Sequence, residues 1–163
     1  MVKKFYLLVL LFCSYFSCFS QEAYPPFKRT MKIPEFSIEN AVDSSIFSEK
    51  NLAKNKKTVF IYFSPDCGHC TFFVKKMIDS IQLVKHTQIV MVAAGEFSKI
   101  QNFYNEYKLS KYCFITVGRD RTYFFISHFG ITQYPAAFVY DKKGNFVKSF
   151  ESEIDLHELF SDK

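Results

Sequence analysis

Two cysteines separated by two residues are the feature of this sequence most able to do chemistry. Cys67, Gly68, His69 and Cys70 form a C-x-x-C motif at the end of an apolar stretch, residues 58–64. If a helix begins at Cys67, one turn separates the two sulfurs, which is close enough for a disulfide. The free N–H groups and the dipole at a helix start favour a thiolate at Cys67, whereas Cys70 would lie further in and be more buried. This asymmetry suits attack by Cys67 and resolution by Cys70.

Other uses of a C-x-x-C motif fit the sequence less well. A purely structural disulfide would not need a helix N-terminus. A structural zinc site needs four ligands, and the chain has no second C-x-x-C. Covalent haem attachment needs a histidine directly after the second cysteine, and Thr71 stands there. A copper chaperone stays open as an alternative, since Cys67 and Cys70, with His128, would suit Cu(I).

The residues around the motif predict alternating strands and helices. Residues 58–64 (TVFIYFS) are β-branched and aromatic, as in a buried strand, and the apolar residues after Cys67 recur at helical spacing. This strand, the helix and the next strand imply a parallel pair with a right-handed crossover. The other predicted strands are residues 33–37, 88–94, 113–117, 136–141 and 145–150, the last two as a hairpin, and the other predicted helices are 45–54, 96–107, 122–129 and one at the C-terminus.

A proline precedes one of the predicted strands. Tyr134 and Pro135 stand directly before residues 136–141. A proline at this place can simply mark the strand boundary. Together with a C-x-x-C after the first buried strand, it predicts a cis peptide that faces the two sulfurs.

With these features the chain resembles the thioredoxin superfamily, and most closely the exported thiol–disulfide proteins of the TlpA/ResA and redoxin-like group. The resemblance covers about residues 33–163 and rests on the strand TVFIYFS, the motif CGHC, the Tyr134-Pro135 pair and the hairpin FVYDKKGNFV. It implies an α/β fold with a central mixed β-sheet flanked by helices. It also implies a thiol–disulfide oxidoreductase that needs no cofactor and acts on protein thiols and disulfides.

The resemblance assigns roles to residues of the motif and of the proline loop. Cys67 would be the nucleophile and Cys70 the resolving thiol. Pro135, with Tyr134 before it, would line the groove for the partner protein. His69 stands where thioredoxin has proline, so the motif is similar to that of protein disulfide isomerase. A cationic side chain there would stabilise the reduced form and make the disulfide more oxidising.

The sequence departs from the family at the positions that usually handle the proton of the second cysteine. Ile61 stands where thioredoxins carry a buried aspartate, Phe73 where ResA-like proteins often carry glutamate, and Lys75 where a proline commonly kinks the helix. No buried acid is therefore expected beside Cys70. Asp66 is near the motif, and we expect it to modulate the site from the solvent side.

A peroxiredoxin-type peroxidase is a weaker alternative. Such enzymes carry threonine three residues and proline seven residues before the reactive cysteine, and here those positions are Ser64 and Phe60. The odd thiol, Cys113, lies between two aromatic residues, and the sequence predicts it to be buried as a small apolar side chain.

The first twenty residues have the layout of a secretory signal peptide. Lys3 and Lys4 precede an apolar run at residues 5–16, and Cys18 and Ser20 are the small residues expected before a cleavage site. An uncleaved membrane anchor or a lipid on Cys18 are the alternatives. Export would place the protein in the periplasm or cell envelope, where disulfides persist, with an upstream membrane or envelope redox donor as a further partner.

Composition sets the remaining limits. The chain has 163 residues and 48% hydrophobic residues, which rules out disorder as the main state. This length predicts one domain, at residues 33–163. Residues 21–32 contain Pro25 and Pro26 and show no periodicity, so they are predicted to form a linker or an irregular lead-in. The formal charge of +5 falls to +3 without Lys3 and Lys4, which is too mild to favour nucleic-acid binding.

Overall fold

The computed structural model describes Pro25 and residues 27–161. The predicted signal peptide, residues 1–20, with its cleavage point, lies outside these residues. Within the described part, no helix has the length and apolar character needed to cross a bilayer.

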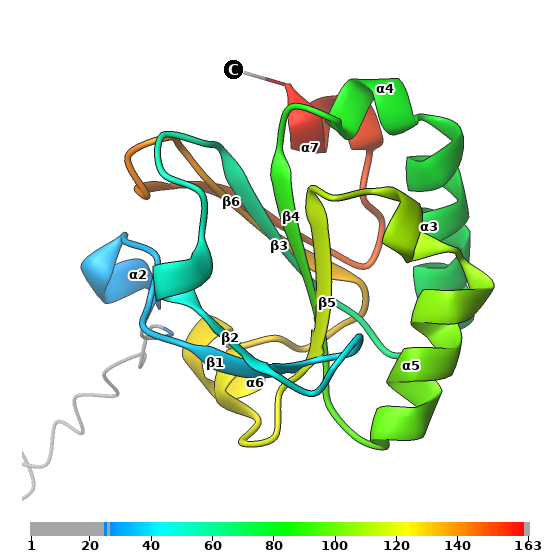
Figure 1. The fold of residues 1–163 in the computed structure, drawn as a ribbon. Helices are drawn as coiled ribbons and strands as arrows, with labels where there is room; N and C mark the ends of the chain where they lie inside the picture. The colour runs from blue at the N-terminus through cyan, green and yellow to red at the C-terminus, as the bar shows by residue number, and fades with distance from the viewer. Residues whose placement is uncertain (1–24, 26, 162–163) are drawn as a thin grey trace, which may run out of the picture.

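A mixed seven-stranded sheet forms the centre of the molecule, in the order β2-β1-β5-β4-β3-β6-β7 (Figure 1). The strands β3, β4 and β5 run parallel, whereas β1 with β2 at one edge and β6 with β7 at the other pair antiparallel. Their bounds are Ser37–Asn40 (β1), Ile46–Ser48 (β2), Thr58–Tyr62 (β3), Gln88–Ala93 (β4), Ile115–Arg119 (β5), Ala136–Tyr140 (β6) and Phe146–Glu151 (β7). This arrangement confirms the predicted α/β fold.

Helices cover both faces of the sheet (Figure 1). One face carries α3 (Gly68–Asp79), α4 (Ile81–Val84), α5 (Phe97–Glu106) and α7 (Leu156–Phe160), and the other carries α2 (Phe27–Thr30) and α6 (Phe124–Phe129). Two short 3-10 helices, η1 (Glu49–Asn51) and η2 (Leu109–Lys111), complete the described elements.

The strand that leads to the motif is buried on both faces. All five residues of β3 are buried, and their side chains alternate between the two cores. Val59 and Ile61 pack on the side of α3, whereas Phe60 and Tyr62 pack on the side of α6. A continuous apolar run therefore belongs to a central strand with helices above and below it.

Three predicted segments differ from the structure. Residues 45–54 were expected to be helical but form β2 and η1, because Ile46–Ser48 pairs with β1 and the Ser48 and Asn51 side chains then cap the 3-10 turn. The edge strand predicted at residues 33–37 corresponds to β1, which begins only at Ser37, the last residue of the predicted range. The strand predicted at 113–117 begins at Ile115, because Cys113 lies in the turn closed by the Ile115 N–H and the Tyr112 carbonyl.

Part of the segment predicted as a linker takes part in the fold. Phe27 in α2 is only 2% exposed. Its ring centre lies 5.5 Å from that of Phe129, 5.5 Å from that of Phe138 and 5.1 Å from that of Phe146. Aromatic rings at these separations attract one another beyond their simple burial.

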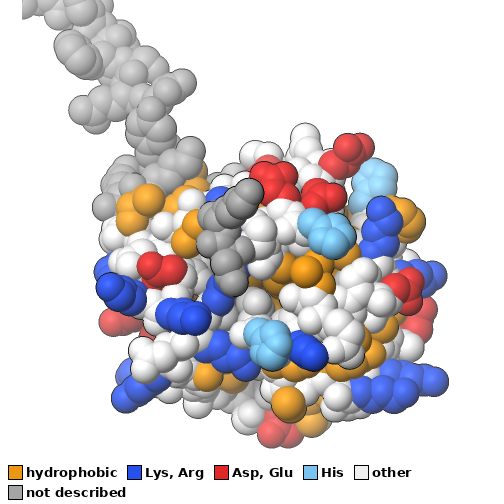
Figure 2. All heavy atoms as spheres, turned by 90° about the horizontal axis from the view of Figure 1, so that it is seen from above, with side chains coloured by type: hydrophobic (Ala, Val, Ile, Leu, Met, Phe, Trp, Pro, Cys, Tyr) orange, Lys and Arg blue, Asp and Glu red, His pale blue; other side chains and the backbone are white. Residues whose placement is uncertain are grey.

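Figure 2 shows the molecule from the end at which α4 and α7 lie in Figure 1. On this face, Lys and Arg side chains are interspersed with Asp and Glu side chains. A nucleic-acid surface is typically a continuous basic patch, and this face has no such patch.

Candidate active site

Cys67 occupies the N-cap position of α3, as the sequence predicts. Its backbone is extended and its sulfur accepts a hydrogen bond from the Cys70 N–H at 3.2 Å. Pro65, two residues earlier, ends the extended run after β3, and the Cys67 N–H donates to the Ser64 carbonyl to close the turn. The Cys67 sulfur is half-buried and lies where the helix dipole stabilises negative charge. Cys67 is therefore the cysteine of the motif that solvent can reach.

Cys70 lies one helical turn further in and is fully buried. It packs with Ile61 and Phe73 in the core on the α3 side of the sheet. Burial, and after it the hydrogen bond with the Cys67 side chain, raises the pKa of the Cys70 thiol to about 12. Cys70 is therefore protonated at neutral pH, and the two sulfurs of the motif differ in solvent access as the sequence predicts.

The raised pKa of Cys70 makes the stability of the reduced protein depend on pH. Folding keeps the thiol protonated at a pH where the unfolded chain, with an ordinary thiol pKa of about 9, would release the proton. The stability that the folded protein gains from this protonated thiol is therefore fully present well below pH 9 and is lost as pH rises toward 12. Between pH 8 and pH 10, we expect the free energy of unfolding of the reduced wild-type protein to fall by about 1.4 kcal/mol more than that of Cys70→Ala. Urea denaturation with a phosphine reductant measures this difference.

The same comparison has an internal control. Burial also raises the pKa of Tyr62 and of Tyr140, and both tyrosines are present in wild type and in Cys70→Ala. Their contributions cancel in the difference between the two proteins. Equal losses in the two proteins would show that the pKa of Cys70 is not raised in the folded state.

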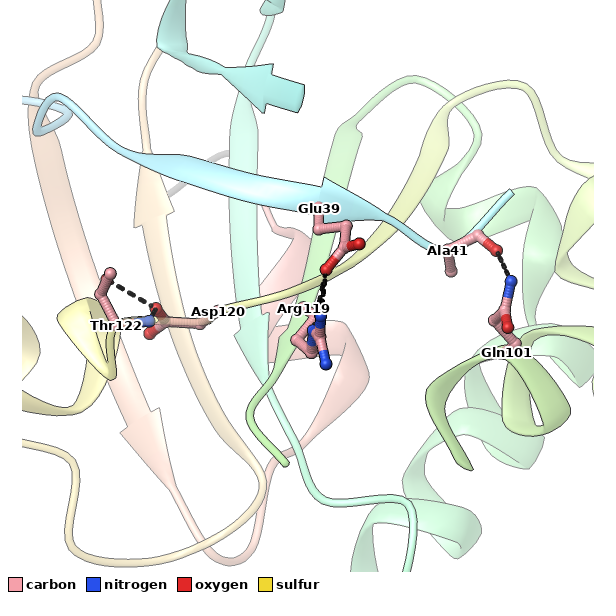
Figure 3. A network of polar contacts seen from close by, with 6 residues as sticks. All are labelled: Glu39, Ala41, Gln101, Arg119, Asp120 and Thr122. Carbon is pink, nitrogen blue, oxygen red and sulfur yellow. Dashed lines mark hydrogen bonds and ion pairs between the residues drawn. The ribbon is translucent and has the colours of Figure 1, made fainter. Parts of the chain in front are cut away.

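No buried acid accompanies Cys70. In the part of the chain that the structure describes, the one buried carboxylate is that of Asp120, in the loop after β5. Its oxygens accept hydrogen bonds from the Thr122 N–H and hydroxyl (Figure 3). They also accept a hydrogen bond from the Phe125 N–H at the start of α6. Asp120 is thus occupied in capping a helix on the opposite face of the sheet, and it is not available as a proton acceptor beside Cys70.

The peptide between Tyr134 and Pro135 is cis, as the sequence predicts. Pro135 is buried and stands directly before β6, whose first residue Ala136 pairs with Tyr62. One step further in this antiparallel register, Pro135 is level with Phe63, at the same end of the sheet as the loop that carries Cys67. The Tyr134 ring lies 5.7 Å from the Tyr62 ring and is half-buried.

His69 and Asp66 are both exposed beside the motif. The Asp66 carboxylate accepts a hydrogen bond from the Lys99 ammonium at 2.8 Å. This pairing had no signal in the sequence, because the two residues are 33 positions apart on different elements.

A groove of about 480 Å³ runs along the side of α3 next to the motif. Its wall on α3 includes His69 and the exposed ring of Phe72, and its other wall is the loop between β7 and α7, residues 152–155. A larger hollow of about 810 Å³ lies against β1 and β2 and contains no residue of the motif. The groove, rather than this hollow, adjoins the cysteines.

His128 does not join the cysteines. It lies on α6, on the opposite face of the sheet from Cys70, between the rings of Phe124 and Phe129. Burial lowers the pKa of His128, which favours the neutral ring in this apolar setting. Among Pro25 and residues 27–161, no three His, Cys, Asp or Glu side chains converge as metal ligands.

The prediction that Cys113 is buried is wrong. Its thiol is exposed, because the chain between η2 and β5 turns at the surface before the strand begins. Cys113 is therefore a solvent-accessible thiol outside the motif.

Solved structures share this fold. A thioredoxin candidate from Neisseria meningitidis is 24% identical, with a TM-score of 0.63 over 78% of this chain and 83% of that one. A secreted disulfide oxidoreductase of Mycobacterium tuberculosis, homologous to Escherichia coli DsbE, is 17% identical, with a TM-score of 0.63 over 77% and 91%. The exposed lipoprotein thioredoxin Etrx1 of Streptococcus pneumoniae is 19% identical, with a TM-score of 0.54 over 76% and 93%. At these identities the similarity establishes the fold.

Comparison with curated protein sequences gives no significant match. A family model described as thioredoxin-like matches residues 55–146, from just before β3 to the start of β7. The matched segment contains both cysteines of the motif and the cis-proline, and it makes up more than half of the chain. The chain belongs to the thioredoxin-like family.

Proposed function

We propose that this protein is a thiol–disulfide oxidoreductase that exchanges disulfides with envelope proteins through Cys67 and Cys70. The observation that carries the proposal is the arrangement of the two sulfurs on α3. Cys67 is half-buried at the N-cap and accepts a hydrogen bond from the Cys70 N–H, while Cys70 is fully buried behind it. A structural disulfide needs neither a sulfur at a helix start nor this difference in access.

The exchange proceeds in two steps. The Cys67 thiolate attacks one sulfur of a partner disulfide, a new S–S bond forms, and the other partner sulfur leaves as a thiolate. Cys70 then loses its proton and attacks the Cys67 sulfur, which breaks the mixed disulfide and releases the second partner thiolate. The Cys67–Cys70 pair is oxidised by two electrons and the partner disulfide is reduced. The same steps in reverse oxidise a partner dithiol.

The proposed setting is the periplasm or cell envelope. The predicted signal peptide supports it, and two of the structures with this fold are described as a secreted protein and as an exposed lipoprotein. The substrates would be exported proteins with thiols or disulfides, and an envelope or membrane donor would restore the redox state of the pair. If the signal peptide is not cleaved, the protein would remain tethered to the membrane.

The redox potential of the pair tests the proposed chemistry. His69 is exposed at the position next to Cys70, where a positive charge stabilises the thiolate form of Cys67 and hence the reduced protein. We expect a potential nearer to about −180 mV than to the value of about −270 mV typical of thioredoxin. Equilibration with glutathione buffers, followed by alkylation and mass spectrometry, gives the value.

Two variants control this measurement. His69→Gln removes the imidazole beside Cys70 and should lower the potential, whereas His86→Gln makes the same change at an exposed site before β4 and should leave the potential unchanged. A pair that does not equilibrate with glutathione would refute the oxidoreductase proposal. A potential at or below that of thioredoxin would refute only the dominant role of His69.

A further inference from the structure

The residue before the nucleophile carries a negative charge in an unfavourable place. Asp66 directly precedes Cys67, and its side chain is 68% exposed. A carboxylate beside a thiolate disfavours the second negative charge, and between neighbouring exposed groups in water this effect changes the thiolate population by about a few-fold. This charge opposes the stabilisation that the helix start offers to the Cys67 thiolate.

A lysine from another helix is paired with this carboxylate. The Lys99 ammonium lies 2.8 Å from the Asp66 carboxylate, and Lys99 itself is 47% exposed. The hydrogen bond and the charge of Asp66 raise the pKa of Lys99, so the lysine is fully charged at neutral pH. A cation at this distance reduces the electrostatic effect of the Asp66 carboxylate on neighbouring groups.

The helix that carries Lys99 is held firmly at this end. Next to Lys99 on α5, the side chain of Ile100 is fully buried, and the side-chain amide of Gln101 donates to the Ala41 carbonyl at 3.1 Å (Figure 3). At the first residue of α5, the Phe97 ring lies 5.0 Å from the guanidinium of Arg119.

The guanidinium is itself fixed. Arg119 donates to the Glu39 carboxylate across β5 and β1 (Figure 3). Further along α5, the ring of Phe103 lies 4.7 Å from that of Phe63, in the chain between β3 and the motif. These contacts place Lys99 at a defined position over the loop that leads to Cys67.

We propose that Lys99 is a positioning residue for the redox motif, which pairs with Asp66 and cancels its charge beside Cys67. The inference rests on the proposed function, because it takes Cys67 as the reacting thiol. It goes further in assigning to a residue of α5 part of the control over how readily that thiol ionises.

Other titratable groups surround the motif and stay constant in the test. Those on the neighbouring elements are His69, Cys70 and Lys76 on α3, Glu96 before α5, Tyr134 before β6, and Glu153 and Asp155 in the loop before α7. A difference between variants at position 99 or 66 therefore reports the charge at that position.

The test is the pH profile of Cys67 alkylation in the reduced full chain. Iodoacetamide is uncharged and reacts with the thiolate, and mass spectrometry of the Cys67 peptide separates this cysteine from the others. We expect Lys99→Gln to slow the reaction two- to fourfold at pH 6 and to move the profile to higher pH by about 0.3 to 0.6 unit. Lys99→Arg keeps the charge and should retain the wild-type profile.

A double variant distinguishes charge compensation from a structural effect. Asp66→Asn combined with Lys99→Gln removes both charges and should restore the wild-type profile. The effect of Lys99→Gln should also shrink in 1 M salt, because exposed charges are then screened. Lys143→Gln makes the same charge change in the β6–β7 turn, at the other end of the sheet, and should leave the profile unchanged.

The outcomes that overturn the inference are specific. An unchanged profile in Lys99→Gln, or a slow reaction that persists in the double variant, would show that Lys99 does not act by cancelling the charge of Asp66. Because alkylation does not require disulfide exchange, this result is separate from a failure of the proposed function, which the glutathione equilibration detects.

Discussion

Cys70→Ser protein is expected to accumulate partner proteins as high-mass adducts that thiol reductants release. In the proposed exchange, Cys67 at the N-cap can still attack a partner disulfide, but the buried sulfur that would resolve the mixed disulfide is missing. With resolution removed, the adduct persists until an external thiol breaks it. Expression in the envelope, trapping with alkylating agent and non-reducing electrophoresis measure the adducts, and mass spectrometry identifies the partners.

Matched variants define the roles of the three cysteines outside residues 1–24. Cys67→Ser should carry no adducts and should lose exchange altogether, because the nucleophile is gone. Cys113 is exposed and could form adducts of its own, so the comparison is made in a Cys113→Ser background, which should itself exchange like wild type. Equal adducts on Cys67→Ser would reverse the assigned roles. If Cys70→Ser accumulates adducts but Cys70→Ser combined with Cys113→Ser does not, the Cys113 thiol belongs to the mechanism.

The sequence was sufficient to predict the parts of the site that lie close together in the chain. The buried strand β3, the cap at Cys67 and the helix α3 follow one another without interruption, so local patterns were enough to place both sulfurs. The cis peptide before Pro135 was predicted from two patterns together, a proline directly before a strand and a C-x-x-C motif after the first buried strand. The absence of an acid at positions 61 and 73 was equally visible in the sequence.

Features that depend on distant contacts could not be predicted in this way. The strand β2 contains only three residues, and its conformation follows from pairing with β1 rather than from its own pattern. The exposure of Cys113 depends on where β5 begins. Asp66 and Lys99 meet only because α5 packs beside the loop after β3, and nothing in either local sequence indicates the other.

The clearest case is Phe27, which lies in the segment predicted as a linker. Two prolines and the lack of periodicity in residues 21–32 gave no sign of packing, yet this ring is buried among three aromatic residues that follow it by more than 100 positions. A single aromatic side chain can dock on a core without a pattern around it. Residues before β1 thus contribute to the core that backs β3 on the side of α6.

Phe27→Ala should therefore destabilise the protein substantially. Removing a buried phenylalanine loses its burial and leaves a cavity between Phe129, Phe138 and Phe146, with an expected cost of about 3 kcal/mol in the free energy of unfolding. Urea denaturation of the reduced protein, followed by circular dichroism, measures this loss. Thr30→Ala changes an exposed residue of the same helix and should stay within about 0.5 kcal/mol of wild type. If Phe27→Ala behaves like Thr30→Ala, the segment before Ile33 is a linker after all, and the core on the α6 side is complete without it.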